Sequence, residues 1–185
     1  VRSIQLFSRV PTSAVRRIGL DTSSRSSHAL LQIVLAEKYD LHPEFSDCPP
    51  SIDPQSAEVD AVLLIGDAAL RRLGSTPYSL DLGAEWDELT GLPFVYACWV
   101  ARGDVDLGNI AQILQRAKEF SIEQIPEIAR IEAGELGLPE ELCHHYLTHH
   151  IFYDLGESEI AGLNCFYDLA VKHNLATPGI PLRFA

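Results

Sequence analysis

One stretch of the chain, residues 78–99, constrains the fold more than any other, because three structural devices follow one another with no linker between them. Residues 78–82 predict a short strand, which Gly83 is expected to end. An acidic helical turn is predicted over residues 85–89. The Gly-Leu-Pro sequence at 91–93 then stops this helix, since glycine suits a helix C-terminus and proline cannot continue a helix.

The segment that follows, Phe94 to Val100, is entirely apolar. A continuous apolar run of this length predicts a strand that is buried on both faces. Cys98 lies within the run and is therefore expected to be buried. A strand, a short helix and a second strand in this order favour an α/β fold.

Strands and helices also alternate ahead of this stretch. Further strands are predicted at residues 3–8, 17–20, 43–46 and 59–65. Helices are predicted after the second and the last of these, over residues 25–39 and 68–73. Beyond residue 102 the pattern is helical, over residues 107–136, 139–150 and 158–174. The expected architecture is a parallel or mixed sheet with covering helices.

Composition excludes several classes of function. The 185 residues, 46% of them hydrophobic, suffice for one domain or two small lobes, and no apolar run approaches the length of a membrane span. A formal charge of −12 argues against general attraction to nucleic acid or to an anionic membrane surface. Residues 1–50 nevertheless carry a net charge of +1, from six basic and five acidic side chains. This weakly favours an anionic ligand there, although Arg16 and Arg17 are more simply explained as a solvated face.

Neither the cysteines nor the histidines form a recognised metal or redox motif. The four cysteines, Cys48, Cys98, Cys143 and Cys165, are too far apart for a Cys-x-x-Cys pattern, and unpaired thiols suit a reducing cytoplasm. Four histidines, His144, His145, His149 and His150, include a pair one helical turn apart. No cysteine or carboxylate completes a ligand set at the usual spacing. A surface helix is therefore predicted, and no metal.

The loop at residues 21–27 is the strongest candidate binding site. It joins a predicted strand to a predicted helix, and the free N–H groups of a helix N-terminus attract anions. One helix cap needs a single hydroxyl, which Ser23 or Ser24 would supply. The loop offers five, on Thr22, Ser23, Ser24, Ser26 and Ser27. Arg25 is the only cation among them and is expected either to pair with a carboxylate ligand or to fold back on Asp21.

Two further pairs of residues are candidates. Gly66 and Asp67 follow a buried strand, where α/β folds place ligand-handling groups. Gly66 would allow close approach to the backbone. Asp67 either acts as a general base, holds a substrate hydroxyl or, as the simpler interpretation, is a helix N-cap. Trp86 and Thr90 share one helix face at a spacing of four and either line a cleft or serve packing.

These residues together resemble a known enzyme family. The segments 21–27, 63–67 and 78–99 are similar to those of the chorismate dehydratases of the futalosine route to menaquinone. The resemblance implies an α/β fold of the periplasmic-binding-protein-like type II, with two lobes and mixed sheets. Residues 10–92 would form the second lobe, and residues 1–9 and 93–185 part of the first. The family carries a further N-terminal segment, so the first lobe is expected to be incomplete in this chain, which contains no methionine.

The resemblance also implies a reaction. Such enzymes eliminate water from chorismate to give 3-[(1-carboxyvinyl)oxy]benzoate, in the cytoplasm and without a cofactor. Substrate contacts are expected from residues 22–27, Gly66, Trp86 and Thr90, with Asp67 as the catalytic candidate. The related 1,4-dihydroxy-6-naphthoate synthases place a Thr-Thr pair at Ser26 and Ser27 and a histidine base at Gly66, so the glycine favours the dehydratase. A non-catalytic solute-binding protein for a small carboxylate remains the alternative of a different class.

Overall fold

The computed structural model describes residues 2–179 and divides the chain into two compact units. Within this range, the first comprises residues 2–96 and 156–177, and the second residues 97–155 with 178 and 179. Residue 1 and residues 180–185, which the sequence assigned to the first lobe, lie outside the described residues. No helix within the described range combines the length and the apolar character needed to cross a membrane.

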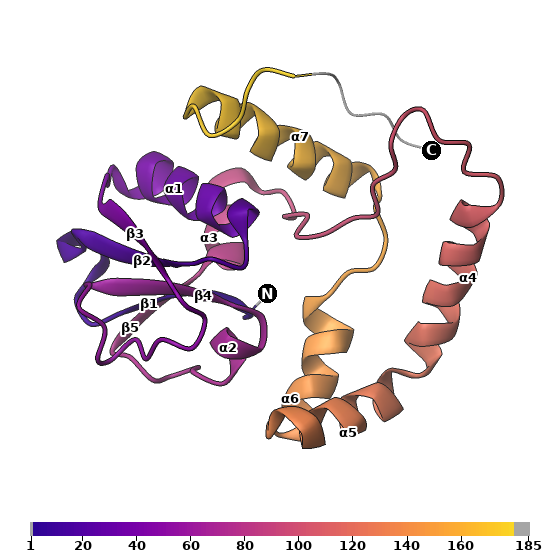
Figure 1. Cartoon of the computed structure of the whole chain (residues 1–185), viewed down its shortest axis with the longest axis horizontal. Helices are drawn as coiled ribbons and strands as arrows, with labels where there is room; N and C mark the ends of the chain where they lie inside the picture. Colours follow the sequence, from indigo (N-terminus) through magenta and orange to yellow (C-terminus); the bar gives the residue numbers. More distant parts are fainter. Residues whose placement is uncertain (1, 180–185) are drawn as a thin grey trace. The chain divides into compact units, whose positions relative to one another are not determined.

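The first unit is built on a mixed sheet of five strands, as the alternation of elements predicted (Figure 1). Its strands are β1 (Ile4–Ser8), β2 (Arg17–Asp21), β3 (Glu44–Cys48), β4 (Ala61–Ile65) and β5 (Tyr78–Asp81). Their order in the sheet is β3-β2-β4-β1-β5. Strand β2 runs parallel to β3 and β4, whereas β1 is antiparallel to β4 and β5. The α/β class is therefore confirmed.

The ends of the helices in the first unit are set by capping residues and glycines. They are α1 (Arg25–Tyr39), α2 (Gly66–Leu70), α3 (Leu82–Thr90) and α7 (Glu157–Lys172), with a 3₁₀ turn η1 (Thr12–Ala14). Gly91 takes a φ of +66° and ends α3, as predicted. Gly83 does not end β5, because Asp81 both closes the strand and caps α3 by accepting the Gly83 N–H.

The sheet has a large core on one face and a smaller one on the other. On the larger face, side chains such as Leu6, Ile18 and Leu63 pack with residues of α1, α3 and α7. On the opposite face, Phe7 and Leu64 pack with Ala69 of α2 and with the connection that follows β3. Figure 1 shows α1 along one side of the strands and α2 on the other. Both faces of the sheet are thus covered within this unit.

An aromatic cluster joins α3, the segment after it and α7. The ring of Trp86 meets those of Phe94 and Phe166 edge-on, at centroid distances of 5.4 and 6.1 Å. Gly162 of α7 lies so close to the segment that a Cβ there would come within 2.0 Å of the Pro93 carbonyl oxygen. A glycine is required at 162 because the two backbones touch.

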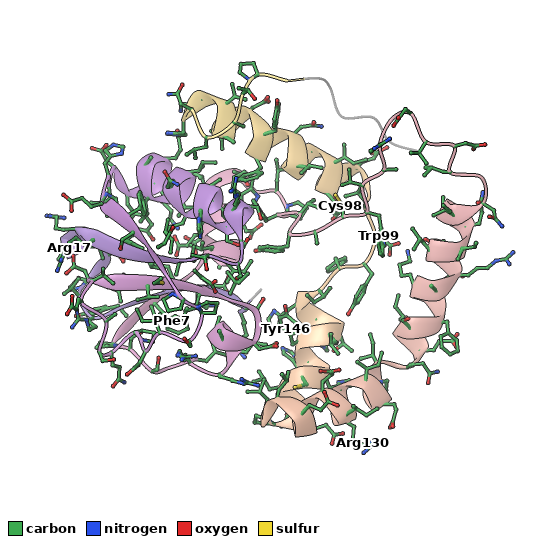
Figure 2. The ribbon with its side chains drawn as sticks, in the orientation of Figure 1. Phe7, Arg17, Cys98, Trp99, Arg130 and Tyr146 are labelled. Carbon is green, nitrogen blue, oxygen red and sulfur yellow. The ribbon has the colours of Figure 1, made fainter. Side chains whose placement is uncertain are left out.

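The predicted strand Phe94 to Val100 is the clearest error of the sequence analysis. Residues 93–100 form no strand, and Cys98 and Trp99 are exposed rather than buried (Figure 2). Apolar composition gives a segment β propensity, but a strand also needs a neighbour to satisfy its N–H and C=O groups. Within residues 2–179 no strand pairs with this segment.

The second unit is helical, as predicted beyond residue 102. Its elements are α4 (Ile110–Glu123), α5 (Ile125–Leu136), α6 (Glu140–His145) and a π-helical turn η2 (Tyr146–His150). The helical span predicted over residues 107–136 divides at Gln124, because Pro126 lacks an N–H and its ring would clash with the carbonyl of Ile122. A small core of Ala129, Ala133 and Cys143 holds α5 against α6.

The division into units differs from the predicted lobe boundaries at two places. Strand β1 belongs to the same sheet as the strands that follow it, and α7 packs on α1. Residues 4–8 and 157–172 therefore lie in one unit with residues 10–92. The assignment of lobes stays a prediction.

Candidate functional site

The two predicted ligand-binding segments emerge at the same edge of the sheet. Strands β2 and β4 are parallel and in register, with Leu20 opposite Leu63. Their carboxyl ends therefore meet, and the loop that begins at Asp21 lies beside the turn at Gly66. Strand β3 ends there too, with Cys48 opposite Asp21. The structure thus brings together the two segments that the sequence singled out separately.

The loop after β2 is held by hydrogen bonds to Asp21. The Oδ1 atom of Asp21 accepts bonds from the Ser23 N–H (2.9 Å) and from the Ser23 hydroxyl (2.7 Å). The Thr22 N–H donates to the Cys48 carbonyl (3.3 Å), and His28 Nε2 contacts the Asp21 carbonyl (2.5 Å). A carbonyl only accepts, so this imidazole nitrogen carries a hydrogen and is not available as a base.

Ser24 caps helix α1, as the simpler interpretation of the loop predicted. Its Oγ accepts the Ser27 N–H at 3.3 Å, and its hydroxyl donates to Ser27 Oγ at 2.9 Å. Ser27 is buried under the first turn, whereas Ser26 is exposed. Of the two serines compared with the Thr-Thr pair, only Ser26 therefore presents its side chain at the surface.

Several donors remain available at this N-terminus after the cap is made. The N–H groups of Arg25 and Ser26 lie in the first turn and have no acceptor within the helix. Thr22 and Arg25 are exposed, and within the described residues Arg25 forms no ion pair, so it does not fold back on Asp21. Backbone N–H groups, hydroxyls, the guanidinium and the helix dipole together suit a carboxylate.

Gly66 and Asp67 begin helix α2 rather than precede it. Gly66 has a φ of +57° and donates its N–H to the Ser3 carbonyl at 2.7 Å. The N-cap position belongs to Ile65, which makes no side-chain cap, so the expectation that Asp67 caps this helix is wrong. The Asp67 side chain is exposed in the first turn. Open space surrounds the position of a Gly66 Cβ, which leaves this backbone approachable.

Trp86 and Thr90 serve the interior of the unit. Trp86 is fully buried in the aromatic cluster, in agreement with its interpretation as a packing anchor. Thr90 donates its hydroxyl to the Trp86 carbonyl (2.9 Å) and accepts the Leu92 N–H (3.2 Å), which closes the end of α3. A contact of either side chain with a substrate stays a prediction.

Sequence reasoning missed three neighbours of the loop. Asp21 was considered only as the start of the loop and as a partner for Arg25, Cys48 was considered only as a thiol, and the contact of His28 with the loop was not foreseen. The Asp-x-Ser spacing is the available signal for the Asp21 bonds, because aspartate often binds the backbone two residues on. Burial, and then the charges of Asp21 and Asp47, raise the pKa of Cys48 to about 11, so this thiol stays protonated at neutral pH.

The histidines of the second unit are close together. The His145 and His149 rings stack with centroids 4.4 Å apart, and His150 meets His145 edge-on at 5.0 Å. Within residues 2–179, no group of three or more histidine, cysteine or carboxylate side chains is arranged to hold a metal ion.

Comparison with known proteins gives one consistent result. The family described as menaquinone biosynthesis matches residues 1–172. The chorismate dehydratase of Thermus thermophilus is 32% identical over 184 aligned residues. This alignment covers 90% of the chain and 67% of the Thermus enzyme.

Proposed function

Because the chain belongs to the menaquinone biosynthesis family, we propose that it acts as a chorismate dehydratase. The reaction eliminates water from chorismate and gives 3-[(1-carboxyvinyl)oxy]benzoate. The ring loses a proton from one carbon and hydroxide from the next, and these combine as water. Aromatisation supplies the driving force, so the protein needs to orient the substrate and move one proton.

The single observation that carries this proposal is the set of donors at the N-terminus of α1. Chorismate bears two carboxylates, and an anion gains most from N–H groups and a guanidinium that are not already paired. Arg25 and Ser26 supply both kinds of donor at an exposed position on the edge of the sheet. Thr22 adds an exposed hydroxyl group beside them.

The remaining roles follow from position. Gly66 leaves room for the ring beside the loop, and Asp67 stands one residue further on as the proposed proton acceptor. Glycine at 66 offers no imidazole, which supports the dehydratase over the related 1,4-dihydroxy-6-naphthoate synthases. The proposed enzyme works in the cytoplasm, uses no cofactor and binds no nucleic acid.

A two-lobed fold of the periplasmic-binding-protein-like type II forms part of the same proposal. Strands β2 to β5 and helices α1 to α3 place most of residues 10–92 in one unit, which also includes β1 and α7. Residues 1–9 and 93–185 are assigned to the other lobe by resemblance alone. In such a fold, the apolar segment 94–100 would have neighbouring strands, which accounts for its composition.

The proposal is tested with full-length protein and chorismate, by following the change from the diene to the aromatic ultraviolet spectrum. The unchanged protein should convert chorismate, and Ser26→Ala combined with Ser27→Ala should lose most of the activity. A matched control, Ser13→Ala with Ser46→Ala, removes two exposed hydroxyls outside the loop and should leave the rate unchanged. Tight binding without any spectral change would instead identify a solute-binding protein, and the absence of both would contradict chorismate as the ligand.

A further inference from the structure

Asp21 combines deep burial with incomplete hydrogen bonding. Its side chain is 1% exposed, and its Oδ1 atom takes both bonds from Ser23. Its Oδ2 atom is buried as well and has no hydrogen-bond partner within the described residues. Burying a carboxylate in this way costs free energy of folding, because a buried charge is normally compensated by a cation or by several hydrogen-bond donors.

In the part of the chain that the structure describes, the surroundings of Asp21 offer no further interaction that offsets the cost of burying its carboxylate. Asp21 points to the face of the sheet that carries Phe7 and Leu64, since Cys48, its partner in register on β3, belongs to that apolar cluster. Neighbouring Cys48 belongs to the same apolar cluster, and Arg25 forms no ion pair with the carboxylate within the described residues. An apolar or neutral side chain would suit this position better on grounds of stability alone.

The backbone around Asp21 is fixed on every side. Strand β2 ends with Asp21, and Thr22 continues its pairing by donating to the Cys48 carbonyl. His28, one turn into α1, reaches back to the Asp21 carbonyl. Ser23 is held by two bonds to the carboxylate, and Ser24 next to it starts the helix. Asp21 therefore determines the path of the chain from the end of the strand to the free donors of the first turn.

We propose that Asp21 is a positioning residue, which holds the loop in its binding-competent conformation through the two Ser23 bonds to Oδ1. This inference rests on the proposed function, since the ligand is taken to be a carboxylate bound at Arg25 and Ser26. An ordered loop has less conformational freedom to lose on binding. Loss of the Asp21 bonds that order it is therefore expected to weaken substrate affinity more than it slows the chemical step.

The acceptor, and not the negative charge, carries this role. A carboxylate beside an anion site opposes the binding of a second carboxylate. Asparagine has nearly the same shape and retains one oxygen that can accept both Ser23 bonds. Asp21→Asn should therefore preserve the loop, whereas Asp21→Ala should release it.

The experiment compares three variants of the full-length protein. Asp21→Ala is expected to raise KM for chorismate about tenfold with kcat within about twofold, since one hydrogen-bonded anchor is worth about that factor. Asp21→Asn should keep KM within about twofold of the unchanged protein or lower it, as the charge is removed. Asp47→Ala is the control, because it removes an exposed carboxylate near the end of β3 without touching Ser23, and it should not raise KM.

A second readout does not depend on the substrate. Amide hydrogen exchange over residues 21–28 should become faster in Asp21→Ala and stay unchanged in Asp21→Asn, while the melting temperature of Asp21→Ala stays equal or rises. Equal exchange rates in all variants would overturn the inference about Asp21, whether or not chorismate is converted. Failure to convert chorismate would instead contradict the proposed function alone. If Asp21→Asn were as impaired as Asp21→Ala, the negative charge would be required and the inference would be overturned. A fall in kcat at constant KM would overturn it too, because Asp21 would then act in the chemical step.

Discussion

The two compact units of the chain treat their apolar side chains in opposite ways. In the first unit both faces of the sheet are covered, and Trp86 is fully buried. In the second, α4 contains no buried residue, and Trp99 and Phe120 are 84% and 67% exposed. Among the described residues, every exposed large hydrophobic side chain except Leu73 and Tyr78 lies within residues 97–155.

This difference shows that an amphipathic sequence pattern in a helix does not by itself bury the apolar side chains of that helix. Both units carry amphipathic helices, but only in the first do they pack on a sheet within the described residues, whereas in the second α5 and α6 share a small core and α4 has no buried residue. Burial of apolar area is the main source of stability, so the same substitution should have very different consequences in the two units. Matched pairs of substitutions test this expectation directly.

The largest contrast is expected between the two tryptophans of the chain. Trp86→Ala should lower the free energy of unfolding by about 3–5 kcal/mol, because it opens a cavity in the aromatic cluster. Trp99→Ala should change it by no more than about 0.5 kcal/mol, as for other exposed positions. Urea denaturation followed by far-ultraviolet circular dichroism measures both, and similar losses for the two variants would refute the contrast.

A smaller contrast of opposite signs is expected for two helical glycines. Gly162→Ala should destabilise the first unit by about 1–3 kcal/mol, since its methyl group would overlap the Pro93 carbonyl. Gly134→Ala, in α5, meets nothing within 4 Å and should stabilise that helix by about 0.5–1 kcal/mol. Thermal unfolding of each variant would show the two signs, and a neutral Gly162→Ala would mean that α7 does not approach residue 93 so closely.

The smallest effect concerns ion pairs. Glu37 of α1 binds Lys172 of α7 (2.7 and 2.9 Å) and His173, and these two partners, Lys172 first, lower the pKa of the Glu37 carboxyl. Because the pKa is lowered in the folded state, the stabilisation is present at neutral pH and is lost as the pH falls through that pKa. Glu37→Gln should cost about 0.5–1 kcal/mol at pH 7 and flatten the loss of stability toward acid.

Its control lies in the second unit. Glu127 pairs with Arg130 within one helix, and both side chains are well exposed. Glu127→Gln should leave the unfolding midpoint unchanged at pH 7. Melting temperatures of the two variants between pH 7 and pH 4 would decide, and a larger shift for Glu127→Gln would contradict the contrast between the units.

The sequence predicted those parts of the fold that depend on local signals. The strand β2, a hydroxyl cap at Ser23 or Ser24, the stop at Gly91 and a parallel or mixed sheet follow from hydrophobic periodicity, from hydroxyl chemistry and from glycine. Segment 94–100 was predicted wrongly, because apolar composition does not reveal whether a pairing strand is adjacent.

The candidate site was predicted as a location and not as a set of contacts. The loop at residues 21–27 and the turn at Gly66 do share one edge, as strands running in parallel require. The distribution of donors and acceptors within the loop was beyond the sequence. The Asp21–Ser23 bonds and the reach of His28 depend on where the backbone turns, and the buried position of Ser27 depends on how α1 sits on the sheet.

The aromatic cluster of Trp86, Phe94 and Phe166 has a consequence for synthesis. Phe166 belongs to α7, which leaves the ribosome only after the whole intervening stretch of residues 97–155. At about 5–20 residues per second, this interval lasts about 3–12 s. During it, α1 and α3 already cover part of the larger apolar face, but the part that α7 covers stays exposed, so the nascent chain is expected to benefit from a chaperone until α7 arrives.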